Sequence, residues 1–340
     1  MLRRQLTGSR ILQARLQIDY ICAAKSDKEI KHMVQRLPNG LGYTYQILLH
    51  NIATRYPTKI QEVQKLFRCL VAAASPMTAR QLAEVLAIED EENDLDLDAV
   101  ATDPYDVLES ISALVRIEDL DGLISVVKLC HYSFQEYLSS DEIRQSPVNN
   151  FYVDKKEAHA WITGLCLRYL TFDVFSKPLE ESLDPDVGEV YVFRVYAAFN
   201  WYRHATLAGD YWSATNTAIP FVYLFFNSVE GPPCYTRWQD LLSTTYTDTN
   251  FFDYSPICLC IWLGLNDTAK NLIQQLPSLD YTFENGLTCL AVAAKENNLY
   301  IAEYLLQHGA NAEQPSSEPE FTRAMTPIHF AAEYGASEVF

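Results

Sequence analysis

The stretch TPIHFAAEYG (residues 326–335) decides the fold of the C-terminal part of this chain, because two earlier stretches follow the same template. They are SPICLCIWLG (255–264) and TCLAVAA (288–294). Each opens with a hydroxyl residue that can cap a helix, and small or apolar residues fill the turns that follow. The template therefore predicts a short helix that recurs along the chain.

The spacing of these stretches points to a repeat family. Ser255 and Thr288 are 33 residues apart, and Thr326 follows 38 residues later. The period and the template resemble those of ankyrin repeats, whose motif is T-P-L-H-x-A-A-x-x-G. We expect Glu313–Thr322 to be an insertion in a hairpin loop, and Gly309 to end the second helix of its unit.

The first and last units depart from the motif. Cys258 and Cys260 replace His and Ala, and Leu276-Pro277 replaces the terminal Gly, which suits a capping repeat that meets a preceding helical segment. The third unit stops at Phe340, before its second helix. We therefore expect a truncated stack of repeats.

A different pattern runs from about residue 58 to 145. Apolar spacing predicts three helices, then a β-hairpin across Glu118–Gly122, then a closing helix. This order is that of a winged-helix module. The predicted elements are helices Lys59–Ala74, Ala79–Ala87 capped by Thr78, and Asp106–Ile111, strands Ala113–Ile117 and Leu123–Leu129, and helix His131–Ser139.

The remaining segments are also predicted to be helical, so the fold class is mainly α. Residues 10–36 form a helix pair with a capping box at Ser26, and a further helix ends before Pro57. Residues 155–250 are helices dense in aromatics, broken at prolines. The predicted domains are 1–57, 58–145, 146–250 as a helical connector, and 251–340 as the repeats.

Several motifs resemble fungal NACHT/STAND receptors of the NOD-like type. The resemblance implies the part of such a receptor that follows its nucleotide switch: a NACHT tail, a GPI inositol-deacylase-type winged helix, a connector and ankyrin repeats. The switch itself would lie upstream. The matching stretches are ARLQIDYIC (14–22), LPNGL (37–41), ASPMT (74–78), LCHYSFQEYL (129–138) and YAAFNWYRH (196–204).

Composition bounds the partners and the compartment. The 26 Lys and Arg residues stand against 44 Asp and Glu, and a net charge of -18 opposes nucleic acid as a ligand. The winged helix could still suggest DNA binding, but its helix 78–87 offers Arg80 against Glu84. Eight cysteines without a CxxC pair indicate reduced thiols, and no apolar run is long enough to cross a membrane.

We therefore expect a cytoplasmic protein. The arginine-rich, acid-free first 18 residues also have the composition of a mitochondrial presequence, although a clipped helix explains them better.

No motif predicts catalysis, a cofactor or a metal. The glycines form no P-loop and no G-x-S-x-G elbow. Asp94, Asp96 and Asp98 imitate a calcium loop that then lacks its glycine and glutamate. The pairs Cys130-His131, Cys258-x-Cys260 and Trp201-x-x-His204 are explained by packing. The sequence therefore predicts a protein that is not an enzyme.

The predicted function is a regulatory protein–protein interaction module of a NOD-like signalling protein. The winged helix and connector would form a relay, and the concave face of the ankyrin repeats would bind a protein partner. The alternative is a fragment of a NACHT ATPase whose P-loop lies upstream. The predicted contact residues are Phe283, Glu284, Asn285, Lys295, Glu296, Asn297, Arg323, Glu333 and Tyr334.

Overall fold

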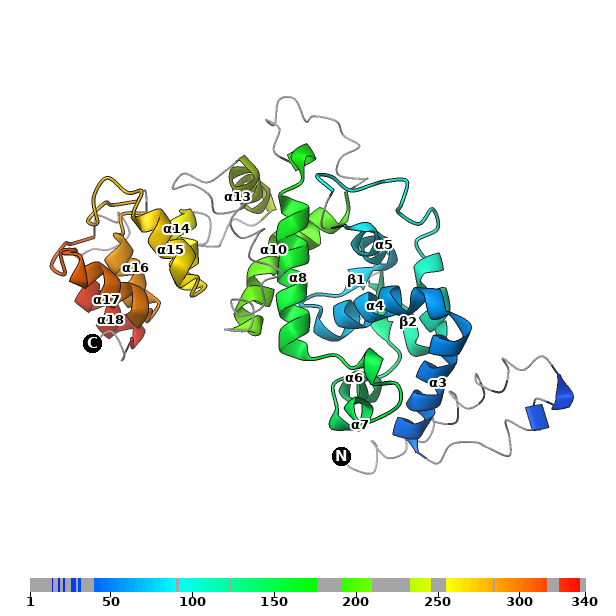
Figure 1. Ribbon diagram of the computed structural model, residues 1–340. Helices are drawn as coiled ribbons and strands as arrows, with labels where there is room; N and C mark the ends of the chain where they lie inside the picture. Colours follow the sequence, from blue (N-terminus) through cyan, green and yellow to red (C-terminus); the bar gives the residue numbers. More distant parts are fainter. Residues whose placement is uncertain are drawn as a thin grey trace. The chain divides into compact units, whose positions relative to one another are not determined.

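Figure 1 shows the computed structural model of the chain, which is mainly helical. It divides into two compact units. The first contains residues up to Glu89 and Asp96–His159, and the second contains Asp90–Leu95 and Ala160 onward. The residues described are a few positions before 40, then 40–89, 92–120, 122, 124–175, 191–209, 233–245, 255–283, 285–316 and 324–336. The predicted helix pair at 10–36 lies largely outside them.

The first unit alternates helices with a small sheet, in the order that the sequence predicts (Figure 1). Helix α8 (Lys155–Leu170) begins in this unit and continues into the second. The other elements are α3 (Leu41–Arg55), η1 (Pro57–Lys59), α4 (Ile60–Ala72), β1 (Met77–Thr78), α5 (Ala79–Ala87), η2 (Asp106–Leu114), β2 (Val115–Leu120), β3 (Ile124–Leu129), α6 (Tyr132–Leu138), α7 (Asp141–Arg144) and η3 (Asn149–Phe151).

The sheet is antiparallel, with the strand order β1-β3-β2. Its hairpin pairs β2 with β3 from Val115 opposite Leu129 to Leu120 opposite Ile124, which confirms the predicted hairpin. Thr78 caps α5 as predicted: Gln81 N donates to Thr78 Oγ1 at 3.2 Å. The segment before the hairpin is a 3₁₀ helix of nine residues, longer than the predicted Asp106–Ile111, and it delays the start of the first hairpin strand to Val115.

Aromatic rings from distant segments form the core of the first unit. The Phe67 ring from α4 lies 5.6 Å from the ring of Phe134 in α6 and 6.0 Å from that of Phe151 in η3. Tyr45 from α3 packs on Phe134 at 4.8 Å. All four side chains are at most 1% exposed. Burial of rings of this size is a dominant stabilising contribution, so this cluster joins the helices of the unit.

The second unit begins with an aromatic helical segment. Its elements are the remainder of α8, η4 (Asp173–Phe175), α10 (Phe193–Ala208) and α13 (Pro233–Thr245). Trp201 and Trp238 pack at 5.6 Å, and Trp238 Nε1 donates to the carbonyl of Ala198 at 2.8 Å. His204 is fully buried and lies 2.9 Å from the hydroxyl of Tyr196. The packing explanation of Trp201 and His204 is confirmed.

The acidic stretch after α5 has a structural use. Asp94 Oδ1 accepts a hydrogen bond from the backbone N–H of Val174 at 3.0 Å, and the Asn93 carbonyl accepts one from Asp173 at 3.1 Å. These bonds hold the loop to η4 within the second unit. Asp94 is thus a backbone acceptor here.

The C-terminal part consists of stacked short helices, coloured yellow to red in Figure 1. The first helices of the three repeats are α14 (Pro256–Trp262), α16 (Cys289–Lys295) and α18 (Pro327–Tyr334). The second helices of the first two repeats are α15 (Asn266–Ile273) and α17 (Leu299–Gln307).

The hydroxyl residues of the template act as predicted. Thr288 Oγ1 accepts from Ala291 N at 3.2 Å, and Ser255 Oγ accepts from Cys258 N at 3.4 Å. In the third repeat, Thr326 Oγ1 lies 2.7 Å from Nδ1 of His329. Gly309 follows α17 with a φ of 92°, a conformation that favours glycine after a helix end.

The loops between successive repeats differ in length where the sequence predicts an insertion. Phe283 N donates to the Leu287 carbonyl at 2.9 Å, and at the corresponding place Ser316 N donates to the Met325 carbonyl at 2.7 Å. The first bond encloses residues 284–286 and the second encloses 317–324, of which 317–323 lie outside the described residues. In sequence, the additional residues of the third repeat therefore fall between Ser316 and Met325, the two partners of this bond.

Candidate protein-binding surface

The ends of the three first helices form the candidate surface. Trp262, Lys295 and Tyr334 are the last residues of α14, α16 and α18, and these helices pack in sequence. Lys295 Nζ lies 5.4 Å from the centre of the Tyr334 ring, so the contact crosses from one repeat to the next. We call Trp262, Lys295, Glu296, Glu333 and Tyr334 the helix-end row.

The buried residues before this row explain why it faces outward. Ala293 and Ala294 in α16, like Ala331 in α18, are at most 1% exposed, so neighbouring helices approach closely along this side. In α16, Lys295 and Glu296 follow these small residues and are partly exposed. Tyr334 is 50% exposed.

The structure brings together four of the predicted contact residues and separates others. Lys295, Glu296, Glu333 and Tyr334 all belong to the helix-end row. Phe283 is only 7% exposed and packs against Tyr281 at 5.4 Å, so it is a core residue of the hairpin and is not available to a partner. Its burial follows from the bond to Leu287 that closes the loop over it.

Two further predicted contact residues, Asn285 and Asn297, occupy loops. Asn285 Oδ1 accepts from Leu287 N at 3.1 Å and so shapes its own turn. Asn297 is exposed and has a φ of 53°, where glycine is usual, which makes it the residue that ends the first helix of its repeat. Glu284 and Arg323 lie outside the described residues.

Two aromatic residues at one end of the row were not among the predicted contact residues. They are Trp262 and Tyr202 of α10, whose rings lie 6.1 Å apart. The template could have identified Trp262, since it occupies in the first unit the position of Lys295 in the second. No local signal in the sequence relates Tyr202 to the repeats.

The charges of the row are unevenly solvated. Burial raises the pKa of the Glu296 carboxyl above its ordinary value, while the neighbouring Lys295 ammonium opposes this effect. Lys295 itself lies over an aromatic face, an arrangement that stabilises a cation. A partner that brings hydrogen-bond donors to Glu296 would relieve its partial desolvation.

The second helices carry a separate aromatic cluster. Lys270 Nζ in α15 lies 3.9 Å from the centre of the Tyr300 ring and 4.8 Å from that of Tyr304, both in α17. Gln274 Nε2 donates to Tyr304 Oη at 3.4 Å. These contacts join the second helices of adjacent repeats, so we assign this cluster to stabilisation of the stack.

The cysteines of the stack are packing residues, as predicted. Cys258, Cys260 and Cys289 are fully buried. Burial raises the pKa of the Cys258 thiol to about 12 and those of Cys260 and Cys289 well above the ordinary value. A thiol that stays protonated is a poor nucleophile.

Within the described part of the chain, no helix is both long and apolar enough to cross a bilayer.

A comparison with protein families identifies the class of the C-terminal part. Residues 256–340 match the model of ankyrin repeats in three copies, which confirms the predicted repeats. Ankyrin repeats generally serve as non-catalytic protein-interaction modules.

One relative is the azaphilone pigments biosynthesis cluster protein L of Monascus ruber. It is 26% identical to this chain over 185 residues, which cover 53% of the chain and 38% of the relative. The chain thus spans well under half of the length of this fungal relative.

Proposed function

We propose that the chain is a non-catalytic protein-interaction and regulatory module, and that the helix-end row of its ankyrin repeats binds a protein partner. The contact between Lys295 and Tyr334 carries this proposal, because it brings a partly exposed cation and an exposed aromatic ring together from two adjacent repeats. Aromatic side chains surrounded by polar ones are typical of the residues that dominate binding energy at protein interfaces. We further propose that the row lies on the concave face of the stack and that the protein acts in the cytoplasm.

We propose the NACHT-type arrangement for the remainder of the chain. The order of α4, β1, α5, η2, β2 and β3, with the sheet order β1-β3-β2, supports a winged-helix module at 58–145. A tail of a NACHT module at 1–57 and a connector at 146–250 complete the proposed domains. The fungal origin of the relative is compatible with a NOD-like signalling protein of fungi.

Proximity labelling in the cells that produce the chain tests the binding surface. The full chain carrying Tyr334→Ala and Lys295→Ala should lose a set of neighbours that the unaltered chain labels. A chain carrying Leu306→Ala, at a 48% exposed position of the second helix α17, is the matched control and should keep them. Loss of the same neighbours in both variants, or in neither, would contradict the assignment to the helix-end row.

A second candidate is a fragment of a NACHT ATPase, in which this chain works together with an upstream nucleotide-binding part. The same segments that resemble NACHT receptors favour it. Titration of the isolated chain with ATP and ADP separates the two proposals. Tight binding of either nucleotide by this chain would favour the ATPase fragment over a module that acts by protein binding alone.

A further inference from the structure

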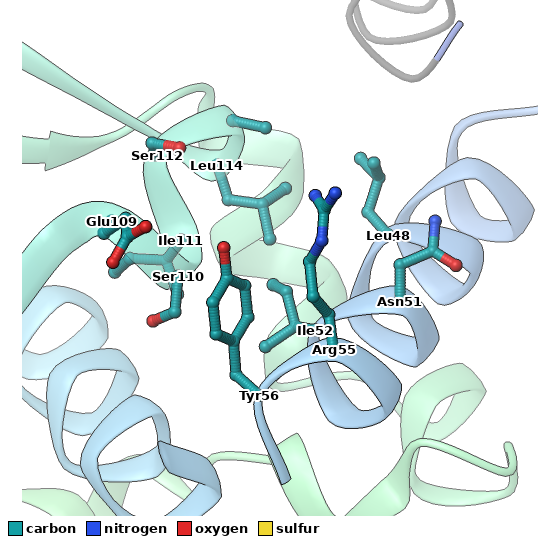
Figure 2. A pocket seen from close by; sticks show the side chains of 11 residues that line it. Leu48, Asn51, Ile52, Arg55, Tyr56, Glu109, Ser110, Ile111, Ser112 and Leu114 are labelled. Atoms are coloured by element: carbon teal, nitrogen blue, oxygen red, sulfur yellow. The ribbon is translucent and has the colours of Figure 1, made fainter. Parts of the chain in front are cut away.

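A cavity in the first unit lies between the end of α3 and the 3₁₀ helix η2 (Figure 2). It encloses about 250 Å³. Its floor is apolar, because Leu48 and Ile52 of α3 are 8% exposed and Leu114 of η2 is fully buried. Sites for drug-sized ligands usually begin at about 300 Å³, so this cavity suits a smaller molecule.

Two opposite charges reach the cavity from different elements. Arg55 and Tyr56 project from the end of α3, and Glu109 lies on the side of η2 (Figure 2). Arg55 and Glu109 form no ion pair with each other or with any residue that the structure describes. Elsewhere in the same unit, Lys128 and Glu118 do pair, at 3.2 Å. The walls of the cavity thus present a guanidinium and a carboxylate that have no ion-pair partner among the described residues.

Ser110 adds a small polar group. It lines the cavity beside Glu109, and the residue is 7% exposed. An apolar floor with a few convergent polar groups is the usual form of a site for a small molecule.

We propose that this cavity binds a free α-amino acid with an apolar side chain. Its carboxylate would lie at Arg55 and the Tyr56 hydroxyl, its ammonium at Glu109, and its side chain on the floor of Leu48, Ile52 and Leu114. A zwitterion brings an opposite charge to both Arg55 and Glu109. A simple acid would leave Glu109 without a positive partner, and a simple amine would leave Arg55 without a negative one.

Calorimetric titration of the full chain tests the chemistry of the ligand. L-phenylalanine and L-leucine are the probes, compared with N-acetyl-L-phenylalanine, which lacks the ammonium, and L-phenylalaninamide, which lacks the carboxylate. We expect each neutralised analogue to bind about tenfold more weakly than phenylalanine, because each loses a charge-assisted hydrogen bond. Equal affinity for phenylalanine and both analogues would overturn the proposal, as would no binding of either amino acid at about 10 mM.

Substitutions locate the site and test the pairing of charges. Arg55→Gln should weaken the binding of phenylalanine about tenfold and leave that of phenylalaninamide unchanged. Glu109→Gln should weaken the binding of phenylalanine by a similar factor and leave that of N-acetylphenylalanine unchanged. Arg80→Gln and Glu136→Gln remove the same charges at exposed positions of the same unit and serve as matched controls. Control variants that weaken binding as much as the cavity variants would overturn the assignment. Circular dichroism checks that each variant is folded. The outcome of these titrations does not depend on whether the helix-end row binds a protein.

Discussion

The first unit and the ankyrin stack are stabilised in different ways. In the first unit, rings that are far apart in sequence meet, such as Phe67 and Phe134. In the stack, α14 and α16 each contact the second helix of the same repeat and the equivalent first helix of the next repeat. Long-range clusters make a unit cooperative, whereas stacked repeats gain stability from each neighbouring pair. The comparison shows that mutations should act globally in the first unit and locally in the stack.

The largest expected effect comes from the aromatic cluster. Phe67→Ala removes a fully buried ring that contacts Phe134 and Phe151, and should lower the free energy of unfolding of the first unit by about 3–5 kcal/mol. Hydrogen exchange should increase throughout residues 40–89 and much less in 255–336. The matched control is Tyr43→Ala, whose ring is 52% exposed, and it should have little effect. Equal loss of protection in both regions would show that the first unit and the ankyrin stack do not unfold independently.

The reverse experiment concerns close packing within the stack. Ala293→Leu inserts a large side chain at a fully buried position of α16 and should lower stability by about 1–3 kcal/mol. Protection against hydrogen exchange should fall in α14, α16 and α18 and remain in the first unit. Ala332→Leu makes the same change at an exposed position of α18 and should be nearly neutral. If the two variants were equally destabilised, close approach of the helices at Ala293 would not be the cause of the loss.

A smaller effect is expected at the helix caps, which both regions use. Thr288→Ala in the stack and Thr78→Ala in the first unit each remove a hydrogen bond to a helix N–H and should cost about 1 kcal/mol. Chemical denaturation measures both, with Thr58→Ala at an exposed position as the control. A much larger loss for Thr288→Ala would indicate that this threonine also holds the hairpin between repeats.

The comparison also explains what the sequence could predict. The stack depends on local signals, so the cap at Thr288, the position of Gly309 and the period of the repeats were all predicted from neighbouring residues. The hairpin of β2 and β3 was predicted for the same reason. The burial of Phe283 was not, because it depends on a loop bond to Leu287 rather than on residue type.

The two candidate sites also differ in whether local sequence signals could predict them. Lys295 and Tyr334 could be predicted from the repeat template, since equivalent positions in stacked units lie on one side. The cavity with Arg55 and Glu109 could not, because it forms where α3 meets η2 and no motif relates these elements. Sites built by tertiary contacts between dissimilar elements require the structure.

The last prediction concerns Glu296, whose half-buried carboxyl distinguishes the helix-end row from an ordinary exposed face. Burial raises its pKa above 4.5, so the folded stack binds this proton more tightly than the unfolded chain does. The sign follows: the contribution of Glu296 to stability is fully present below pH 4.5 and is lost as the pH rises through the folded pKa. Glu296→Gln should therefore stabilise the stack slightly at pH 7 and give no gain below pH 4.5. Thermal unfolding at both pH values measures the difference, with Glu303→Gln at an exposed position of α17 as the control. A gain that does not change with pH would mean that desolvation of the carboxylate is not its cause, and would remove the argument that a partner's donors are needed there.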